Sequence, residues 1–124
     1  MFTLCILLLS ATSIIASPLF AKVSIIDNSS VEISWYTLQT EISSVHFMDA
    51  EHAMSTKDLI ERGEEITGAP TADGDRFHHK VILPDLSSHK TYVYICGSAD
   101  FGWSGIHSFT TPGFEPTIAV LGNI

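Results

Sequence analysis

The feature that most constrains the fold is a series of short segments in which apolar and polar residues alternate between turns. In residues 31–37, Val31, Ile33 and Trp35 fall on one face. Strand-like segments recur along the chain, at residues 23–26, 44–48, 76–83, 92–96 and 103–111. Alternation of this kind predicts strands that bury one face, and no segment of helical period and useful length interrupts them. We therefore expect an all-β protein in which two antiparallel sheets pack as a sandwich.

Residues 49–65 do not share this pattern. They are polar and contain the helix formers Ala50, Glu51, Ala53 and Met54, so a single helical turn and an irregular edge strand both fit. Turn signals close the region at residues 68–70 and 73–75.

Leu86 and Tyr92 have the spacing of a tyrosine corner, in which the ring packs into the core and the hydroxyl bonds to backbone a few residues upstream. We expect four core residues of this kind to hold the domain together, namely Trp35, Leu86, Tyr92 and Phe109. Without the leader described next, about 100 residues remain, the size of one immunoglobulin-like or fibronectin type III-like sandwich.

The first 21 residues read as a leader. Met1 to Ala16 are mostly apolar and carry no charged side chain, which is typical of the h-region of a secretory signal peptide. Cleavage after Ala16 or Ala21 fits, and we assign residues 1–21 to the leader. An uncleaved anchor is the alternative, because a stretch of about 20 residues spans a bilayer, although Pro18 and several Ser and Thr residues weaken it. We expect a secreted protein, extracellular or lysosomal, without membrane contact after cleavage.

The formal net charge is −8, and the six Lys and Arg residues are scattered along the sequence. This pattern argues against binding to nucleic acid or to anionic lipid. Asn28 opens the sequon Asn28-Ser29-Ser30 in a turn-like segment, so we predict glycosylation of Asn28. Cys5 leaves with the leader, and Cys96 cannot then form an internal disulfide. A buried thiol and a bridge to a second chain both remain open for Cys96.

Residues 112–116 read as a linker, and Thr117 to Gly122 form an apolar run without alternation. Such a run is typical of a central strand in an α/β domain, buried on both faces. We assign residues 22–111 to the sandwich, and residues 112–124 to a linker and the truncated start of a second domain. Left without partners, this orphan strand would pair with other chains, so we expect self-association through it.

Three segments in combination resemble purple acid phosphatases, most of all the animal, acid phosphatase type 7-like branch: FHHKVILPDLSSHKTYVYICGS, GWSGIHSFTTP and TIAVLGN. The strand VEISWYT resembles an early strand of the same family, and the resemblance covers residues 23–122. It implies a fibronectin type III-like domain that precedes a metallophosphoesterase domain and has that catalytic domain as its partner.

The resemblance also implies a parent enzyme that hydrolyses phosphate monoesters at a dinuclear metal centre of iron with iron, zinc or manganese. In the family the first catalytic strand ends in Gly-Asp, and this Asp is a metal ligand. Here Asn123 follows Gly122, and a neutral amide is a poorer ligand for a hard cation than a carboxylate. We expect this chain to hold no catalytic residue, metal ligand or cofactor, and to be inactive alone.

We therefore predict that the chain is a non-catalytic N-terminal accessory domain of a purple acid phosphatase. Two alternatives stay open: an independent secreted fibronectin-like binding or adhesion module, and a truncated gene model of an active acid phosphatase.

The remaining polar residues show no catalytic pattern. His78 and His79 are neighbours in a predicted strand, so they point to opposite faces and cannot chelate one ion. Trp103, at the start of a strand, is a candidate interface residue. Four carboxylates close to a loop are interpreted as solvated turn residues: Glu64, Glu65, Asp73 and Asp75.

Overall fold

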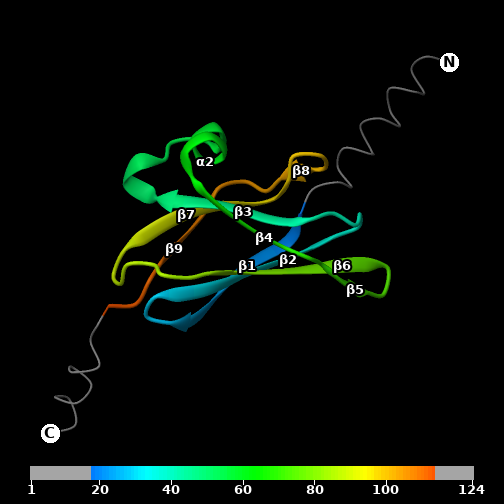
Figure 1. Cartoon of the computed structure of the whole chain (residues 1–124), viewed down its shortest axis with the longest axis horizontal. Helices are drawn as coiled ribbons and strands as arrows, with labels where there is room; N and C mark the ends of the chain where they lie inside the picture. The colour runs from blue at the N-terminus through cyan, green and yellow to red at the C-terminus, as the bar shows by residue number, and fades with distance from the viewer. Residues whose placement is uncertain (1–17, 114–124) are drawn as a thin grey trace, which may run out of the picture.

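Two antiparallel sheets pack face to face in the computed structural model, which describes residues 18–113 (Figure 1). The first sheet has the order β1-β2-β6-β5 and consists of β1 (Leu19–Asp27), β2 (Ser30–Thr37), β6 (Arg76–Leu83) and β5 (Thr71–Asp73). The second has the order β4-β3-β7-β8, with β9 also paired to β7. Its strands are β4 (Glu64–Gly68), β3 (Ser43–Asp49), β7 (Thr91–Ser98), β8 (Gly102–Trp103) and β9 (His107–Thr110). The predicted all-β sandwich is confirmed.

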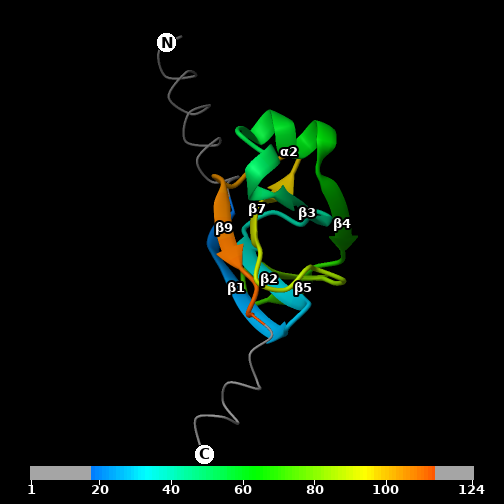
Figure 2. The same ribbon diagram turned by 90° about the vertical axis from the view of Figure 1, so that its left-hand side faces the viewer.

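The register explains the alternation in the sequence. Ile33 of β2 lies opposite Val81 of β6, and Trp35 lies opposite His79. Because side chains alternate across a strand, these inward pairs form one half of the core. Figure 2 shows the two layers edge-on, with β1, β2 and β5 in one and β3, β4 and β7 in the other. The second layer adds its own inward residues, including Val45, Phe47, Tyr92, Tyr94, Cys96 and Phe109.

Residues 49–65 contain both structures that the sequence left open. A 3₁₀ turn η1 (Ala50–His52) and a short helix α2 (Thr56–Arg62) precede the edge strand β4. The Ser55 side chain caps α2 by accepting from the Asp58 N–H, and the Gly63 N–H donates to the Leu59 carbonyl at the other end. The helix lies over the outer side of the second sheet, where Leu59 is 0 % exposed.

Two boundaries differ from the prediction. Strand β1 begins at Leu19, earlier than Val23, so three residues that we assigned to the leader pair with β2 or adjoin that pairing. The predicted strand 103–111 is two strands, because residues 104–106 belong to neither β8 nor β9. The Ser104 N–H still donates to the Cys96 carbonyl at 2.8 Å, but the Cys96 N–H donates to the Ser104 hydroxyl, at 3.0 Å, and not to a backbone carbonyl.

The leader before Pro18, the strand 117–122 and Asn123 lie outside the described residues. In the described part of the chain, no helix has the length and apolar character to cross a membrane.

Candidate functional site

The four residues predicted to hold the domain lie in its core. Trp35, Leu86, Tyr92 and Phe109 are all buried. The Tyr92 hydroxyl accepts a hydrogen bond from the Ser87 N–H at 2.8 Å, the upstream backbone contact of a tyrosine corner. These side chains therefore stabilise the sandwich and are not available to a ligand.

Asn28 is exposed in the turn between β1 and β2. The preceding Asp27 shapes this turn, since its carboxylate accepts from the Ser29 N–H and the Ser30 hydroxyl, each at 2.8 Å. The Ser29 backbone bond is the main reason why the pKa of Asp27 is lowered. Glycosylation at this accessible position remains a prediction.

Cys96 is 0 % exposed within the core. Burial raises the pKa of its thiol to about 12, although the hydrogen bond with Ser104 acts in the opposite direction. The structure favours the buried-thiol interpretation over the bridge to a second chain, because the sulfur has no access to solvent.

The histidines do not converge. His79 lies inside the core between Thr37 and Ser43, whereas His78 stacks on the ring of Tyr36 on the outer side of the first sheet, with 4.6 Å between ring centroids. No three His, Cys, Asp or Glu side chains among residues 18–113 form a group that could hold a metal ion. The described residues therefore do not fit the dinuclear centre that the family resemblance implies.

The four loop carboxylates separate into different sheets. Asp73 and Asp75 belong to the β5–β6 hairpin, where Asp73 lies 3.7 Å from the Arg76 guanidinium. Glu64 and Glu65 belong to β4 in the other sheet. Because both lie in a strand, the interpretation as turn residues is wrong for Glu64 and Glu65, although both are exposed to solvent. Of the four carboxylates, Glu65 alone lines the hollow described next.

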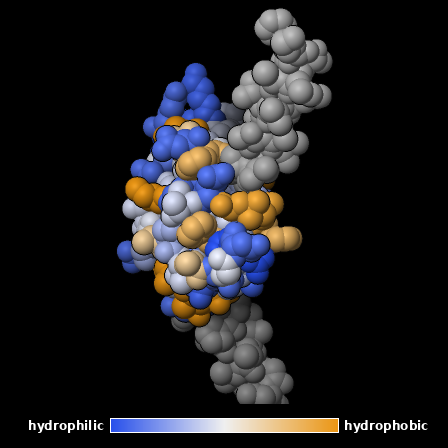
Figure 3. All heavy atoms as spheres, turned by 90° about the vertical axis from the view of Figure 1, so that its right-hand side faces the viewer, coloured by the Kyte–Doolittle hydropathy of each residue, from blue (hydrophilic) through white to orange (hydrophobic). Residues whose placement is uncertain are grey.

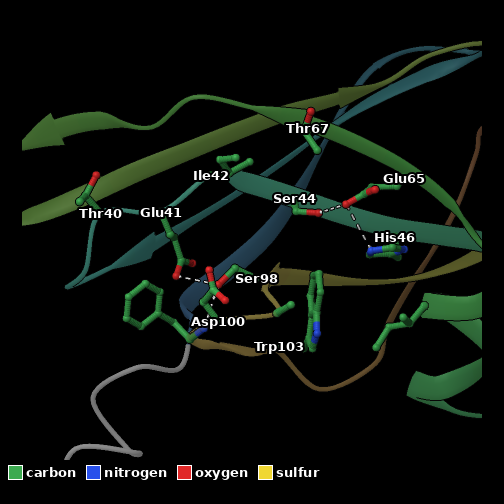
Figure 4. A pocket seen from close by; sticks show the side chains of 13 residues that line it. Thr40, Glu41, Ile42, Ser44, His46, Glu65, Thr67, Ser98, Asp100 and Trp103 are labelled. Atoms are coloured by element: carbon green, nitrogen blue, oxygen red, sulfur yellow. Dashed lines mark hydrogen bonds and ion pairs between the residues drawn. The ribbon is translucent and has the colours of Figure 1, made fainter.

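A hollow of about 410 Å³ opens on the outer side of the second sheet, between the β2–β3 loop, β4 and the β7–β8 turn (Figure 4). We call it the acidic hollow. Three carboxylates line it, from Glu41, Glu65 and Asp100. Its apolar and neutral lining comes from several other segments, namely Thr40, Ile42, Ser44, His46, Ile60, Thr67, Ser98, Ala99, Phe101 and Trp103.

Glu41 is held at one side of the acidic hollow. Its Oε1 accepts from the Ser98 hydroxyl at 3.0 Å, and this hydroxyl in turn accepts from the Phe101 N–H. Its Oε2 is buried and has no hydrogen-bond partner. Burial raises the pKa of Glu41, the Ser98 bond opposes this shift, and the nearby Asp100 charge adds to it.

His46 and Glu65 form the other side. The Glu65 carboxylate accepts from the Ser44 hydroxyl at 2.9 Å and lies 3.5 Å from His46 Nε2. Trp103 stands edge-on to the His46 ring, with centroids 5.0 Å apart. His46 is only 7 % exposed, and its Nδ1 has no hydrogen-bond partner.

The outer side of the first sheet carries basic side chains beside the carboxylate of Glu32. Lys22 of β1 and Lys80 of β6 flank Ser34 of β2 in one row across three strands. The Arg76 guanidinium lies 3.8 Å above the ring of Tyr36 on the same side. Three of the six basic residues thus share one face, so their scatter in the sequence does not persist in the fold. Absence of nucleic-acid binding remains a prediction.

Apolar side chains also reach the surface at the end of the sandwich that carries the β5–β6 turn. Figure 3 shows them interspersed with hydrophilic ones over this end. Among residues 18–113, Phe20 is the most exposed of the large hydrophobic aromatic residues, at 73 %. It has a positive φ of 57° and lies at an irregularity in the pairing of β1.

A family model described as the purple acid phosphatase N-terminal domain matches residues 18–111. The chain belongs to this family. The match begins at Pro18, next to the start of β1, and ends at Thr111, just after β9. It therefore coincides with the sandwich that the structure describes, and the resemblance read from the sequence is confirmed.

Solved structures agree on the fold. The third fibronectin III domain of human KIAA0343 protein has a TM-score of 0.53 at 16% identity, covering 78% of this chain and 82% of that one. The FN1–FN3 domains of chicken CNTN1 have a TM-score of 0.54 at 14% identity, covering 77% and 30%. The sensor domain of the anti-sigma factor RsgI4 from Pseudobacteroides cellulosolvens has 0.51 at 16%, covering 76% and 96%. No curated protein matches the chain. These similarities establish a fibronectin III-like fold and no more.

In this purple acid phosphatase N-terminal domain, the residues after β9 are fastened to the β6–β7 loop. The Thr111 hydroxyl donates to the Ser87 carbonyl at 2.6 Å and accepts from the Lys90 N–H at 2.9 Å. The Pro112 carbonyl accepts from the His89 N–H at 3.0 Å. Thr111 is 2 % exposed, so the chain stays part of the folded domain up to Pro112.

Proposed function

We propose that this domain is a non-catalytic accessory domain that holds a metallophosphoesterase domain in a set orientation within a purple acid phosphatase. The observation that carries the proposal is the fastening of Thr111 and Pro112 to the β6–β7 loop. A flexible link would let the next residues sample many directions. Here five hydrogen bonds join residues 111–112 to the loop. The Thr111 hydroxyl makes three of them, with the Ser87 carbonyl, the Lys90 N–H and, at 3.3 Å, the Lys90 carbonyl. The other two run from the Thr111 N–H to the Lys90 carbonyl and from the His89 N–H to the Pro112 carbonyl.

The proposed role without chemistry follows from the side chains of the domain. In the family, two metal ions would polarise the phosphate and activate a hydroxide. Among residues 18–113, no three His, Cys, Asp or Glu side chains lie together in a group that could hold such an ion. Their contribution to hydrolysis of phosphate monoesters is therefore the position of the catalytic domain, and not a chemical step.

An activity assay tests the non-catalytic part. The purified chain is incubated with p-nitrophenyl phosphate and with iron, zinc or manganese, and we expect release of nitrophenol at the rate of the blank. Metal-dependent turnover clearly above the blank would refute the proposal.

A matched pair of variants tests the positioning part, in the protein encoded by a transcript that continues past Gly122. Thr111→Val removes the hydroxyl bonds and keeps the shape, whereas Thr110→Val removes only a bond to the exposed Thr91 hydroxyl. We expect Thr111→Val to broaden the distribution of domain orientations in small-angle scattering, with Thr110→Val unchanged. Equal scattering from both variants would contradict a positioning role.

An independent secreted binding module is the second candidate. The acidic hollow favours it, because a concave site with convergent polar groups serves binding without any second domain. If every transcript of the gene ends near Ile124, this candidate replaces the accessory role.

A further inference from the structure

We propose that the acidic hollow binds an arginine side chain presented by a partner protein. The inference does not depend on the accessory role, since the partner can be any chain that presents an arginine. It rests on the charge of the hollow, on two buried polar atoms without partners, and on the shape of its walls.

The charge of the hollow is unbalanced. Glu41, Glu65 and Asp100 approach it from three separate segments, and its lining contains no Lys or Arg. Among residues 18–113, no cationic side chain forms an ion pair with Glu41 or Asp100. Carboxylates that share a partly buried site repel one another, so a cation between them is stabilised.

Two atoms in the lining lack hydrogen-bond partners. Glu41 Oε2 is a buried acceptor, and such an atom is costly unless a donor reaches it. His46 Nδ1 is the second, on a ring that is 7 % exposed. When His46 Nε2 carries the proton and donates toward Glu65, Nδ1 is an acceptor as well. Neither atom is exposed to solvent, so a ligand reaches it only when the Glu41 or His46 side chain shifts slightly toward the hollow. A ligand rich in N–H donors would then satisfy both acceptors.

The walls select a planar cation with an apolar stem. Trp103 and Phe101 provide aromatic surfaces, and Ile42 and Ile60 provide aliphatic ones. A guanidinium stacks on aromatic rings and presents five N–H donors in a fixed plane, whereas an ammonium is a compact and strongly hydrated point charge. The arginine methylenes would lie along the isoleucines. A volume of about 410 Å³ is near the lower end for ligand pockets, which suits one side chain.

The binding test uses the full chain and three peptides of the form acetyl-Gly-X-Gly-amide, with X as arginine, citrulline or lysine. Citrulline is a neutral isostere of arginine and removes only the charge. Binding is followed by the indole N–H signals in ¹⁵N–¹H spectra, assigned with Trp103→Phe. We expect the arginine peptide to move the Trp103 signal saturably, to leave the buried Trp35 signal in place, and to bind more weakly as salt is added.

Charge variants locate the site. We expect Glu41→Gln and Asp100→Asn each to weaken binding about fivefold, the effect of one partly exposed charge pair. Glu64→Gln is the matched control, because Glu64 neighbours Glu65 in β4 without lining the hollow. Melting curves verify that each variant is folded, and Asp100→Asn provides the result if Glu41→Gln is unstable.

Four results would overturn the proposal: no saturable shift at millimolar arginine peptide, equal binding of the citrulline peptide, tighter binding of the lysine peptide, or equal affinity in the Glu41, Asp100 and Glu64 variants. Either of the first two results would show that the hollow does not bind a cationic arginine. The third would show that it prefers an ammonium to a guanidinium, and the fourth that the binding site lies elsewhere. None of them bears on the Thr111 experiment.

Discussion

Acidification should destabilise this domain through one buried histidine, His79. The Thr37 hydroxyl donates to the Gln39 carbonyl at 2.7 Å, so it accepts from His79 Nε2, which lies 2.7 Å away. The Ser43 hydroxyl then donates to Nδ1, also at 2.7 Å. This network suits the neutral ring, because a second proton on Nδ1 would force the Ser43 hydroxyl to accept and to turn its own hydrogen away.

The pKa of His79 sets the size and direction of the effect. Burial, followed by the charge of His78, lowers this pKa from 6.5 to about 4. The folded state therefore binds the proton less well than the unfolded state. The contribution of the neutral ring is complete above pH 6.5 and is lost as the pH falls toward 4. The interval corresponds to about 3 kcal/mol of unfolding free energy, a large share of the stability of a small domain.

The assay is urea unfolding, followed by tryptophan fluorescence at several pH values between 7 and 4. We compare the parent chain with His79→Gln, which cannot titrate, and with His107→Gln, which changes an exposed histidine in β9. His79→Gln should be less stable than the parent at pH 7. As the pH is lowered from 6.5 to 4, however, its unfolding free energy should decrease less steeply than that of the parent. The two slopes should differ by up to about 1.4 kcal/mol per pH unit, which corresponds to one proton taken up on unfolding. Parallel pH profiles for the parent and His79→Gln would refute the argument.

Three further results are expected. Tyr92→Phe should lower the unfolding free energy by about 1 kcal/mol, because the Ser87 N–H loses its acceptor. Trp35→Ala should lower it by about 3–5 kcal/mol, because it leaves a cavity in the core. Unchanged thermal melting of both variants would contradict the core assignment. The Cys96 thiol should resist iodoacetamide until the domain unfolds, because burial raises its pKa to about 12; labelling at the rate of a free thiol would show an open core. Ending the chain at Gly113 should keep the fold and reduce light scattering from self-association, whereas unfolding would show that later residues belong to the domain.

The strands with one buried face could be predicted from the sequence, since burial imposes a period of two on the side chains. This is clear for Val31, Ile33 and Trp35, and for His79, a polar residue that shares the inward face of β6. The short edges were less predictable. Strand β5 is exposed along its length, and α2 depends on its Ser55 cap and on Leu59 packing against the sheet. Serine is compatible with a strand, so the sequence could not show that the strand is interrupted at residues 104–106.

The acidic hollow could not be predicted, because its residues come from segments that are far apart in the sequence. Glu41 precedes β3, Glu65 lies in an edge strand and Asp100 lies in a turn. Each looks like an ordinary solvated carboxylate until the order β4-β3-β7-β8 brings the segments together. Trp103 was the one member that the sequence had marked as an interface candidate.

The basic residues are unevenly placed in a chain of net charge −8, because three of the six share the outer side of the first sheet, where Glu32 also lies. Lys22, Arg76 and Lys80 lie on the first sheet, and the acidic hollow lies on the second. Strand β7 also separates the acidic hollow from Thr111 and Pro112, the residues that are hydrogen-bonded to the β6–β7 loop (the exit segment). Ser98, at the end of β7, lines the acidic hollow, whereas Thr91, at the start of β7, pairs with Thr110 next to the exit segment. Eight residues of extended strand span about 25 Å. An arginine of a partner protein in the acidic hollow would therefore not contact the exit segment. Orientation of a catalytic domain and binding of a basic partner can then occur together, and each can be tested separately.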